Sequence, residues 1–292
     1  MVAQPIRSAA VSRADAGDDA FEASARRRRY LVGLGALLGG AANVVMQLSN
    51  PPVGRGVYES TVESGRYDLH PRKRGRTTLT YLAVAMLGTQ EDRLAYRAAT
   101  NTSHRTVKSA PDSEIRYNAF DPELQLWVAA CIYQGVRDCQ VLFFGELDEA
   151  TEDDLYRESA RFGTTLQMGQ DLWPVDRAAF AQYWNGKLHE ISVDPEVKRY
   201  LLDQVVNLGP YERKYRIALG PAHRFFTTGF LPQRFRDELG LPWSPRRQQV
   251  FEILLRALGL ILARLPQRYR LYPYENYLRD MRRRRALGKP LV

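Results

Sequence analysis

The chain has 292 residues, of which 45% are hydrophobic and 26% charged, a balance typical of one large globular domain or two small ones. The net charge of +9 lies mostly near the two ends of the chain. Residues 1–30 carry six arginines against four acidic residues, and residues 273–292 carry six basic residues against two acidic ones. This distribution argues against a nucleic-acid-binding protein, which would have a basic stripe on one folded face. The two cysteines, Cys131 and Cys139, form no CxxC motif, so we expect neither a disulfide framework nor a thiolate metal site, and a reducing, cytoplasmic location.

The N-terminal region combines a polar stretch with an apolar one. We expect residues 1–28 to form a disordered basic tail, since they are rich in Asp, Ala and Arg. Residues 30–48 follow four arginines and are long enough to cross a bilayer or to belong to an export signal. The run is rich in Gly and Ala, contains Asn43 and Gln47, and continues without a cleavage site. This composition favours a buried core helix, with an anchor or a signal as the alternative.

Helical periodicity dominates the rest of the chain. An apolar helix is predicted over residues 78–88, followed by a polar helix that begins at Thr89 with a capping box closed by Asp92 and continues to Ser109, before Pro111. Asp121 and Pro122 have the sequence of a further helix start. Other helices are expected over 147–161, 176–187, 194–206, 231–239, 245–264 and 273–285. Only the segment CQVLFF is ambiguous with a strand, and without a repeat or a linker the chain is predicted to be a single all-α, multi-helix domain.

His104 is the histidine with the most suggestive surroundings. No GxGxxG, Walker A, GxSxG or HExxH motif is present, and the four histidines do not pair at helical spacing. In the predicted polar helix, Ala98, Thr100 and Ser103 leave room beside His104 for a flat cofactor, and a neutral imidazole is the usual axial ligand of haem iron. Its second ring nitrogen would need a partner, for which the helical carbonyl of Thr100 and the side chain of Asn101 are candidates. The alternative, favoured by composition alone, is a capped or surface histidine.

A second candidate element lies at the start of the predicted apolar helix, in the sequence RKRGRTTLTYL. Arg74 and Thr78 are four residues apart and share a helix face there. A guanidinium and a hydroxyl on one side could stabilise negative charge that develops on a reduced oxygen species. The alternative is a basic first turn that only contacts solvent.

Several ordered blocks of the sequence resemble those of the MpaB-type oxygenase and rubber oxygenase (latex clearing protein) family. They are NVVMQLSNPPVGRGV, the R-x-x-x-T element of Arg74 and Thr78, YLAVAMLGT, His104 and YNAFDPELQLWVAA, then WPVDRAAFAQYW and GFLPQRFRDELGLPWS. The resemblance covers about residues 30–265. We therefore expect a family-like helical domain over 29–272 and a basic C-terminal tail over 273–292.

The resemblance implies an all-α fold that encloses a b-type haem. It implies that His104 is the proximal iron ligand and that Arg74 and Thr78 lie near the haem and support activity. Thr77 stands in the apparent place of a distal lysine of some rubber oxygenases, and this departure leaves the distal ligand open. An acidic residue that acts as a base in the family would fall near Glu59.

We accordingly expect a haem b-dependent oxygenase that uses dioxygen or peroxide to oxidise a hydrophobic or lipid-like substrate, with cleavage of a carbon–carbon double bond as one outcome. Arg105 and Lys108, close to the ligand in sequence, are candidates to bind the haem propionates. The alternatives are a non-catalytic haem or lipid-binding helical protein and a membrane-associated interaction protein anchored by residues 30–48. Peripheral membrane association through the basic C-terminus is a further option. Nothing in the sequence indicates a polymer as substrate.

Overall fold

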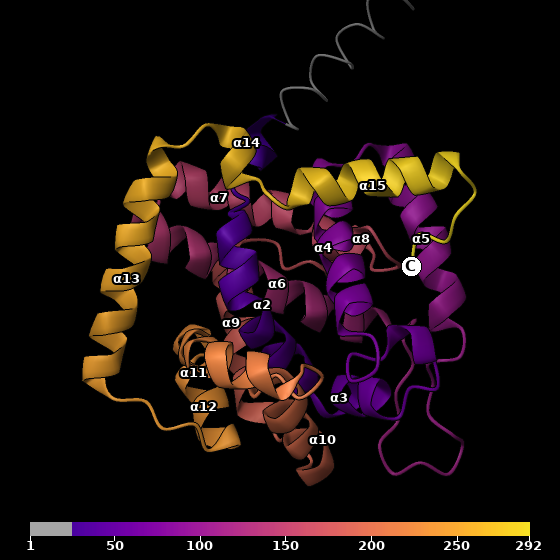
Figure 1. Ribbon diagram of the computed structural model, residues 1–292. Coiled ribbons are helices and arrows are strands. Elements are labelled where there is room, and N and C mark those ends of the chain that lie inside the picture. Colours follow the sequence, from indigo (N-terminus) through magenta and orange to yellow (C-terminus); the bar gives the residue numbers. More distant parts are fainter. Residues whose placement is uncertain (1–24) are drawn as a thin grey trace, which may run out of the picture.

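The computed structural model describes residues 25–292, which fold into one all-helical domain without a named strand (Figure 1). The helices are α2 (Gly33–Leu48), α3 (Pro51–Tyr58), η1 (Glu63–Gly65), α4 (Pro71–Leu87), α5 (Gln90–His104), α6 (Pro122–Phe144), α7 (Glu149–Ser159), α8 (Arg161–Thr164), η2 (Gln170–Leu172), α9 (Arg177–Glu190), α10 (Pro195–Tyr200), η3 (Leu201–Val206), α11 (Arg213–Phe230), α12 (Gln233–Leu239), α13 (Pro245–Arg264), α14 (Gln267–Arg270) and α15 (Tyr274–Ala286). The predicted all-α class is thus confirmed for the described residues.

The tail predicted over residues 1–28 falls mostly outside the described part of the chain. Residues 25–28 are helical, and Arg27 is buried. Its guanidinium donates hydrogen bonds to the Met86 carbonyl at 2.7 Å and to Glu158 at 3.1 Å. This arginine therefore ties the chain to the ends of α4 and α7.

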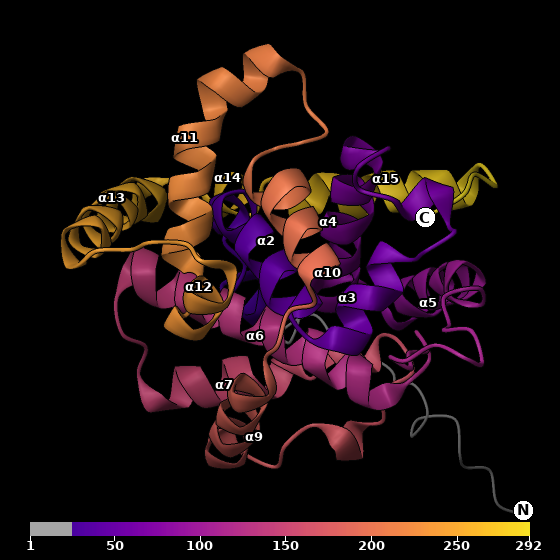
Figure 2. The ribbon, with the colours of Figure 1, turned by 90° about the horizontal axis from the view of Figure 1, so that it is seen from below.

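Helix α2 lies in the middle of the molecule, next to α6 and α11 (Figure 2). Its small residues permit close packing, since a side chain at Gly35 would meet the Cys139 sulfur at 2.7 Å. Its polar residues are satisfied internally: Asn43 donates to the Cys131 carbonyl at 2.6 Å, and Gln47 donates to Asn43 at 2.7 Å. The apolar run after the four arginines is therefore a buried core helix, as predicted. Within the part of the chain that the structure describes, no helix combines the length and the apolar character of a transmembrane span.

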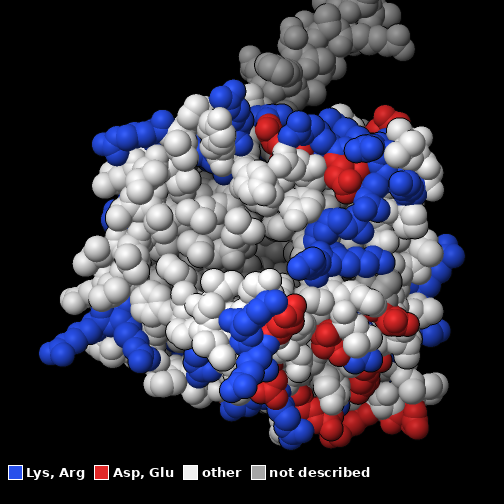
Figure 3. Space-filling model, in the orientation of Figure 1, with Lys and Arg blue, Asp and Glu red and all other residues white. Residues whose placement is uncertain are grey.

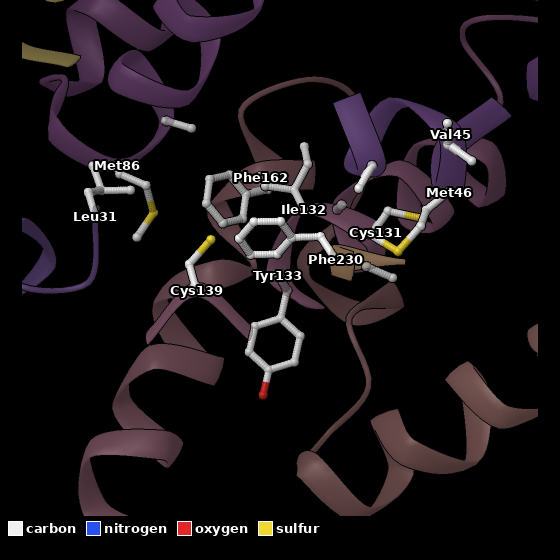
Figure 4. Packing of buried hydrophobic residues seen from close by; sticks show 14 of the residues in the cluster. Leu31, Val45, Met46, Met86, Cys131, Ile132, Tyr133, Cys139, Phe162 and Phe230 are labelled. Atoms are coloured by element: carbon white, nitrogen blue, oxygen red, sulfur yellow. The ribbon is translucent and has the colours of Figure 1, made fainter. Parts of the chain in front are cut away.

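The hydrophobic core gathers around α6, whose 23 residues include the ambiguous CQVLFF segment as helix. Figure 4 shows Ile132 and Cys139 of α6 in the core together with Met46 of α2 and Phe162 of α8. Both cysteines are buried and carry free thiols, as expected without a disulfide framework. Burial raises the pKa of the Cys139 thiol, so this side chain behaves as a small apolar group in the core.

The starts of α4 and α5 show two different outcomes. Helix α4 begins at Pro71, seven residues before the predicted start, because proline at the first helical position supplies a suitable φ and its missing N–H has no partner to lose there. Helix α5 begins as predicted. The Thr89 hydroxyl accepts from the Asp92 N–H at 3.2 Å, and the Asp92 carboxylate accepts from the Thr89 N–H at 3.0 Å.

Helix α5 ends earlier than the prediction of a helix that continues past His104. His104 is its last residue, not a residue in its middle. The following segment bonds to a neighbouring stretch instead, since the Ala119 N–H donates to the Val107 carbonyl and the Ser109 N–H donates to the Tyr117 carbonyl, each at 2.9 Å. Val107 is β-branched and suits this extended backbone better than a helix.

The second half of the chain departs from the prediction at three places. The helix expected over 147–161 is divided into α7 and α8, and the one expected over 194–206 continues from α10 into the π-helix η3. Helix α11 was not predicted, because its interior contains Pro221, a residue that usually ends a helix. Helix α13 has the predicted bounds of 245–264.

The basic segment over 273–292 contains helix α15, which lies across α4 (Figure 1). Tyr274, Leu278 and Met281 are its buried residues. Arg282 donates two hydrogen bonds to the buried Asp92 of α5. The C-terminal arginines are thus engaged within the protein.

Candidate functional site

A large cavity of about 960 Å³ lies among α2, α4, α5, α6 and α11. Most of its wall is apolar, and one face of the molecule is hollowed near its centre (Figure 3). The cavity follows α6 from Leu124 to Cys139, a rise of about 22 Å along the helix axis. Gly40 of α2 and Gly75 of α4 also line it, and no described atom lies within 4 Å of a Cβ added at either position. A space of this kind accepts a large, mainly apolar ligand.

His104 lines this cavity at the end of α5. Burial, together with the positive charge of Arg74, lowers the pKa of His104 to about 4, so the imidazole is neutral at physiological pH. Its Nδ1 is buried and has no hydrogen-bond partner in the described structure. The ring of Phe120 meets the imidazole edge-on, with 6.3 Å between centroids. An orphaned ring nitrogen in an apolar wall is the feature that a metal-bound cofactor would satisfy.

Neither the Thr100 carbonyl nor the Asn101 side chain bonds the second His104 nitrogen, since Nδ1 has no partner among the described residues. The Thr100 hydroxyl donates to the Tyr96 carbonyl at 2.9 Å, which is the usual bond of a threonine to the preceding helical turn. The Asn101 side chain accepts from Gln167. Both groups are therefore committed elsewhere, and the imidazole is held by packing alone in this structure.

Arg74 and Thr78 lie on one face of α4 and also line the cavity. The Arg74 Nη1 donates to the Thr78 Oγ1 at 3.2 Å, as the four-residue spacing predicts. Arg74 keeps accessible surface because it faces the cavity, yet protein surrounds it, and burial lowers the pKa of its guanidinium. No described carboxylate forms an ion pair with it, and the nearby rings of Tyr96 and Tyr200 supply its polar surroundings. Arg74 therefore presents an uncompensated positive charge to the cavity.

His104, Arg74 and Thr78 thus all line the cavity, but Arg105 and Lys108, which were also predicted to bind the cofactor, do not. Arg105 follows the last residue of α5, both side chains are exposed, and neither lines the cavity. Two other basic residues, Arg66 and Arg72, do line it. Arg66 is paired with Asp68, whereas Arg72 is exposed and is the basic residue that the sequence argument missed, although it lies two positions before Arg74.

Thr77 and Glu59 have different places around the cavity. Thr77 lines it, with its hydroxyl donating to the Arg74 carbonyl at 3.0 Å and its own carbonyl accepting from Tyr96 at 2.7 Å. Glu59 does not line it; instead its carboxylate accepts from the Tyr117 hydroxyl at 2.8 Å. Tyr117 does line the cavity, and burial with the Glu59 hydrogen bond raises its pKa to about 12. A carboxylate in this position can reach the cavity only through the tyrosine.

Two more titratable residues line the far part of the cavity. His223 of α11 has its Nε2 3.0 Å from the Val205 carbonyl, and burial lowers its pKa. Asp138 of α6 was not singled out. Burial raises the pKa of Asp138 to about 6, and its carboxylate accepts from Gln134 at 2.9 Å. No motif marks Asp138, since only the fold turns it inward.

The residues present fit a haem better than a protein-only metal site. The described residues contain no group of three or more His, Cys, Asp or Glu that could hold a metal ion. Haem iron needs only one or two axial ligands from the protein, because the porphyrin supplies the others. A neutral His104 with an unsatisfied nitrogen, in an apolar cavity of this volume, meets that requirement.

Comparison with known proteins gives the family. Residues 27–260 match the family described as ER-bound oxygenase mpaB/B'/rubber oxygenase, catalytic domain. An uncharacterized protein of Mycobacterium bovis and one of Mycobacterium tuberculosis are each 45% identical over 252 residues, which cover 86% of this chain and 98% of theirs. No solved structure matches. The chain belongs to the MpaB and rubber oxygenase family.

Proposed function

We propose that this protein is a haem b-dependent oxygenase that oxidises a hydrophobic substrate in the cavity beside α5. One observation carries the proposal: a neutral His104 with an unsatisfied ring nitrogen lines the same apolar cavity as the unpaired Arg74. Membership of an oxygenase family supports it. When bound, the haem supplies the redox chemistry that activates dioxygen or peroxide.

His104 holds the cofactor in this proposal. A neutral imidazole offers a lone pair without first losing a proton, and the low pKa keeps it neutral down to mildly acidic pH. The ring of Phe120 restricts how the imidazole turns. No described group bonds Nδ1, so no hydrogen bond to that atom has to be broken when the cofactor binds.

Arg74 and Thr78 are the proposed catalytic pair. The Arg74 guanidinium is surrounded by protein and has no described carboxylate partner, so its charge acts strongly on negative charge that develops in the cavity. The Thr78 hydroxyl accepts from Arg74 and can donate its own proton toward the cavity. Together they place the Arg74 charge and the Thr78 hydroxyl proton on the same face of α4.

The haem carboxylates need basic partners near the protein surface. Arg72 lines the cavity and is exposed, so it is better placed for this role than the initially expected Arg105, which does not line it. Arg105 stays a candidate only for a carboxylate that leaves the cavity beside the end of α5. The two arginines can be compared by substitution.

The apolar wall specifies the substrate class. It runs along about 22 Å of α6, from Leu124 to Cys139, so it accepts an elongated hydrophobic molecule in addition to the cofactor. Oxidative cleavage of a carbon–carbon double bond is the reaction that the resemblance indicates. The rival in which residues 30–48 serve as an anchor has little support, because α2 is the central core helix.

The deciding experiment is the absorption spectrum of the purified, folded protein, with haem titrated in if none copurifies. We expect a Soret band that His104→Ala abolishes or shifts strongly, while the control His189→Ala, at an exposed histidine, leaves it unchanged. Folded protein that takes up no haem would contradict the proposal.

A non-catalytic haem or lipid carrier on the same fold is distinguished by Arg74. In the oxygenase, Arg74→Ala retains the Soret band and lowers oxidation of hydrophobic substrates by about 10²-fold or more, by analogy with the removal of a single oxyanion-hole donor. In a carrier, the variant leaves every measured oxidation at the level of the wild type.

A further inference from the structure

A continuous group of exposed apolar side chains covers the outer sides of α11 and α13. On α13 these are Val250, Ile253, Leu254, Leu260 and Ile261, and on α11 they are Tyr215, Ile217 and Leu219. Leu265, Tyr269 and Tyr272 extend the surface beyond α13. Figure 3 shows this side of the molecule as a broad uncharged area with Lys and Arg at its edges. An exposed patch of this kind marks a binding surface.

Helix α13 is apolar on both of its long sides. Its inner side, with Phe251, Leu255 and Leu262, is buried against the core. Its outer side presents Ile253 at 67% exposure and Leu260 at 62%. One apolar side of a helix is enough to pack it against a core, so a second apolar side left exposed is a candidate surface for a binding partner.

Arginines lie at the two ends of the exposed apolar side of α13, which we call the outer stripe. Arg246 and Arg264 are eighteen residues apart, which is five helical turns, so both lie on the same side of α13 as the exposed apolar residues. Both are exposed. The stripe therefore has an apolar middle and a cationic group at each end.

The first turns of α11 extend the surface away from the body of the protein. Residues 212–219 are exposed on every side of the helix, as Figure 2 shows for the projecting end of α11. This short stretch alternates basic and apolar residues, RKYRIAL. Tyr and Leu beside Lys and Arg are typical of a helix that lies at a lipid–water boundary.

The positive charges of this surface are unpaired in the described structure. The exposed arginines without a described ion-pair partner are Arg213, Arg216, Arg246, Arg247, Arg256, Arg264 and Arg268. Among the charged residues of α11 and α13, only Lys214 has a described ion-pair partner, Glu212 at 2.8 Å. A second copy of this face would bring the same positive charges together, whereas an anionic surface would neutralise them.

We propose that the α11–α13 face, defined by these exposed apolar residues and arginines, docks onto the anionic surface of a lipid bilayer. The apolar side chains enter the boundary of the acyl chains, and the arginines contact phosphate groups. The fit to phospholipid comes from the combination of an apolar centre with a basic rim.

The face is continuous with the wall of the cavity. Tyr215 and Leu219 belong to the exposed surface of α11 and also line the cavity, as does the exposed Leu37 of α2. A docked protein would receive hydrophobic molecules from the bilayer without exposing them to water. This use of the face rests on the proposed function, but docking itself requires neither haem nor turnover.

The test is cosedimentation of the purified full chain with vesicles. One set contains phosphatidylcholine and phosphatidylglycerol in equal amounts, and the other contains phosphatidylcholine alone. We expect the protein to bind the anionic vesicles, to bind the neutral ones much more weakly, and to be released by added salt. Equal binding to both sets, or binding to neither, overturns the proposal.

Matched variants locate the surface. The double variant Ile253→Asp and Leu260→Asp should lower the partition coefficient by about tenfold or more, whereas Val175→Asp, at a valine that is 90% exposed before α9, should not change it. Arg246→Gln and Arg264→Gln should each lower it about fivefold, with Arg116→Gln as the control at an exposed arginine elsewhere. Melting curves establish that every variant is folded.

The other occupant of the face would be a second copy of the chain. Sedimentation velocity distinguishes it: a dimer that Ile253→Asp dissociates, in a protein that does not bind anionic vesicles, overturns the proposal. Vesicle binding and the Soret spectrum are measured separately, so failure of one leaves the other standing.

Discussion

The side of the molecule formed by α4, α5 and α15 differs from the side formed by α11 and α13 in how its charges are used. On the first side, Arg282 binds Asp92 at 2.7 Å, Arg284 binds Asp280 at 2.8 Å, and Arg285 pairs with Glu91. On the second side, the arginines have no described ion-pair partner, and large apolar side chains are exposed between them.

This difference shows which of the positive charges behind the net charge of +9 are neutralised within the protein and which are not. Within the basic C-terminal segment, which the sequence offered as a contact for anionic lipid, Arg282, Arg284 and Arg285 pair with acidic residues of the same chain. The arginines of α11 and α13 have no described ion-pair partner and remain available to a binding partner outside the cavity. Paired charges hold helices together, and unpaired ones beside apolar surface mark where something else binds.

The largest effect is expected where α13 meets the core. A Cβ at Gly259 would lie 1.7 Å from the Phe143 carbonyl oxygen of α6, so Gly259→Ala must displace the helix. We expect a loss of about 3 kcal/mol or more in the free energy of unfolding, measured by denaturant titration. The control Gly186→Ala, in α9 with no described atom within 4 Å, should be neutral or slightly stabilising.

A comparable effect should come from the titration of His104 on the α4–α5–α15 side. Because its pKa in the folded protein is lowered to about 4, the stability that it contributes is complete above its ordinary pKa of 6.5 and is lost as the pH falls toward 4. The loss should reach about 3 kcal/mol. The free energy of unfolding, measured by denaturant titration at several pH values in this range, should depend less on pH in His104→Leu than in the wild type. The control His70→Gln, at an exposed histidine, should keep the pH dependence of the wild type.

A smaller effect should follow from removing Asp92, the acidic centre of the paired side. Although burial opposes it, hydrogen bonds from Arg282 and Thr89 hold the pKa of Asp92 below its usual range. Asp92→Ala removes the helix cap and the Arg282 contact, so we expect a loss of about 2 kcal/mol. In the wild type, this contribution is present above the ordinary pKa of 3.8 and disappears as the pH falls below it. The control Glu252→Ala, at an exposed residue of α13, should change the free energy of unfolding little. Equal losses of stability in the two variants would contradict the proposed difference between the two sides of the molecule.

The smallest effect on stability should occur on the outer side of α13. Ile253→Ser removes an exposed apolar group, so the free energy of unfolding should change by less than about 0.5 kcal/mol. Vesicle binding by the same variant should nevertheless fall. A large loss of stability would instead indicate that the outer side packs against protein.

Local signals in the sequence were sufficient for the starts of α5 and α6, although not for that of α4. Thr89 with Asp92, and Asp121 with Pro122, form the expected caps, because these interactions involve residues within one turn. The prediction failed at α11, since the cost of Pro221 inside a helix is offset by tertiary packing that no local pattern reveals.

Of the residues proposed from the sequence, His104, Arg74 and Thr78 line one cavity, whereas Arg105 and Lys108 do not, and the contacts of the cavity residues were less predictable still. The spacing of Arg74 and Thr78 sets their hydrogen bond, since both lie on one helix. The end of α5 at His104 depends on the bonds of the next segment, and the partner of Asn101 is Gln167, far away in sequence. Such contacts between distant segments exist only once the chain has folded.

The glycines in the cavity wall have a consequence for how this protein could diversify. A Cβ added at Gly40 or Gly75 would have no atom of another described element within 4 Å, so a side chain there would begin in cavity space. Single substitutions there would shorten the longest molecule that the cavity admits while leaving the packing of α2 and α4 intact. The chain thus carries two positions at which selection can set ligand length independently of fold stability.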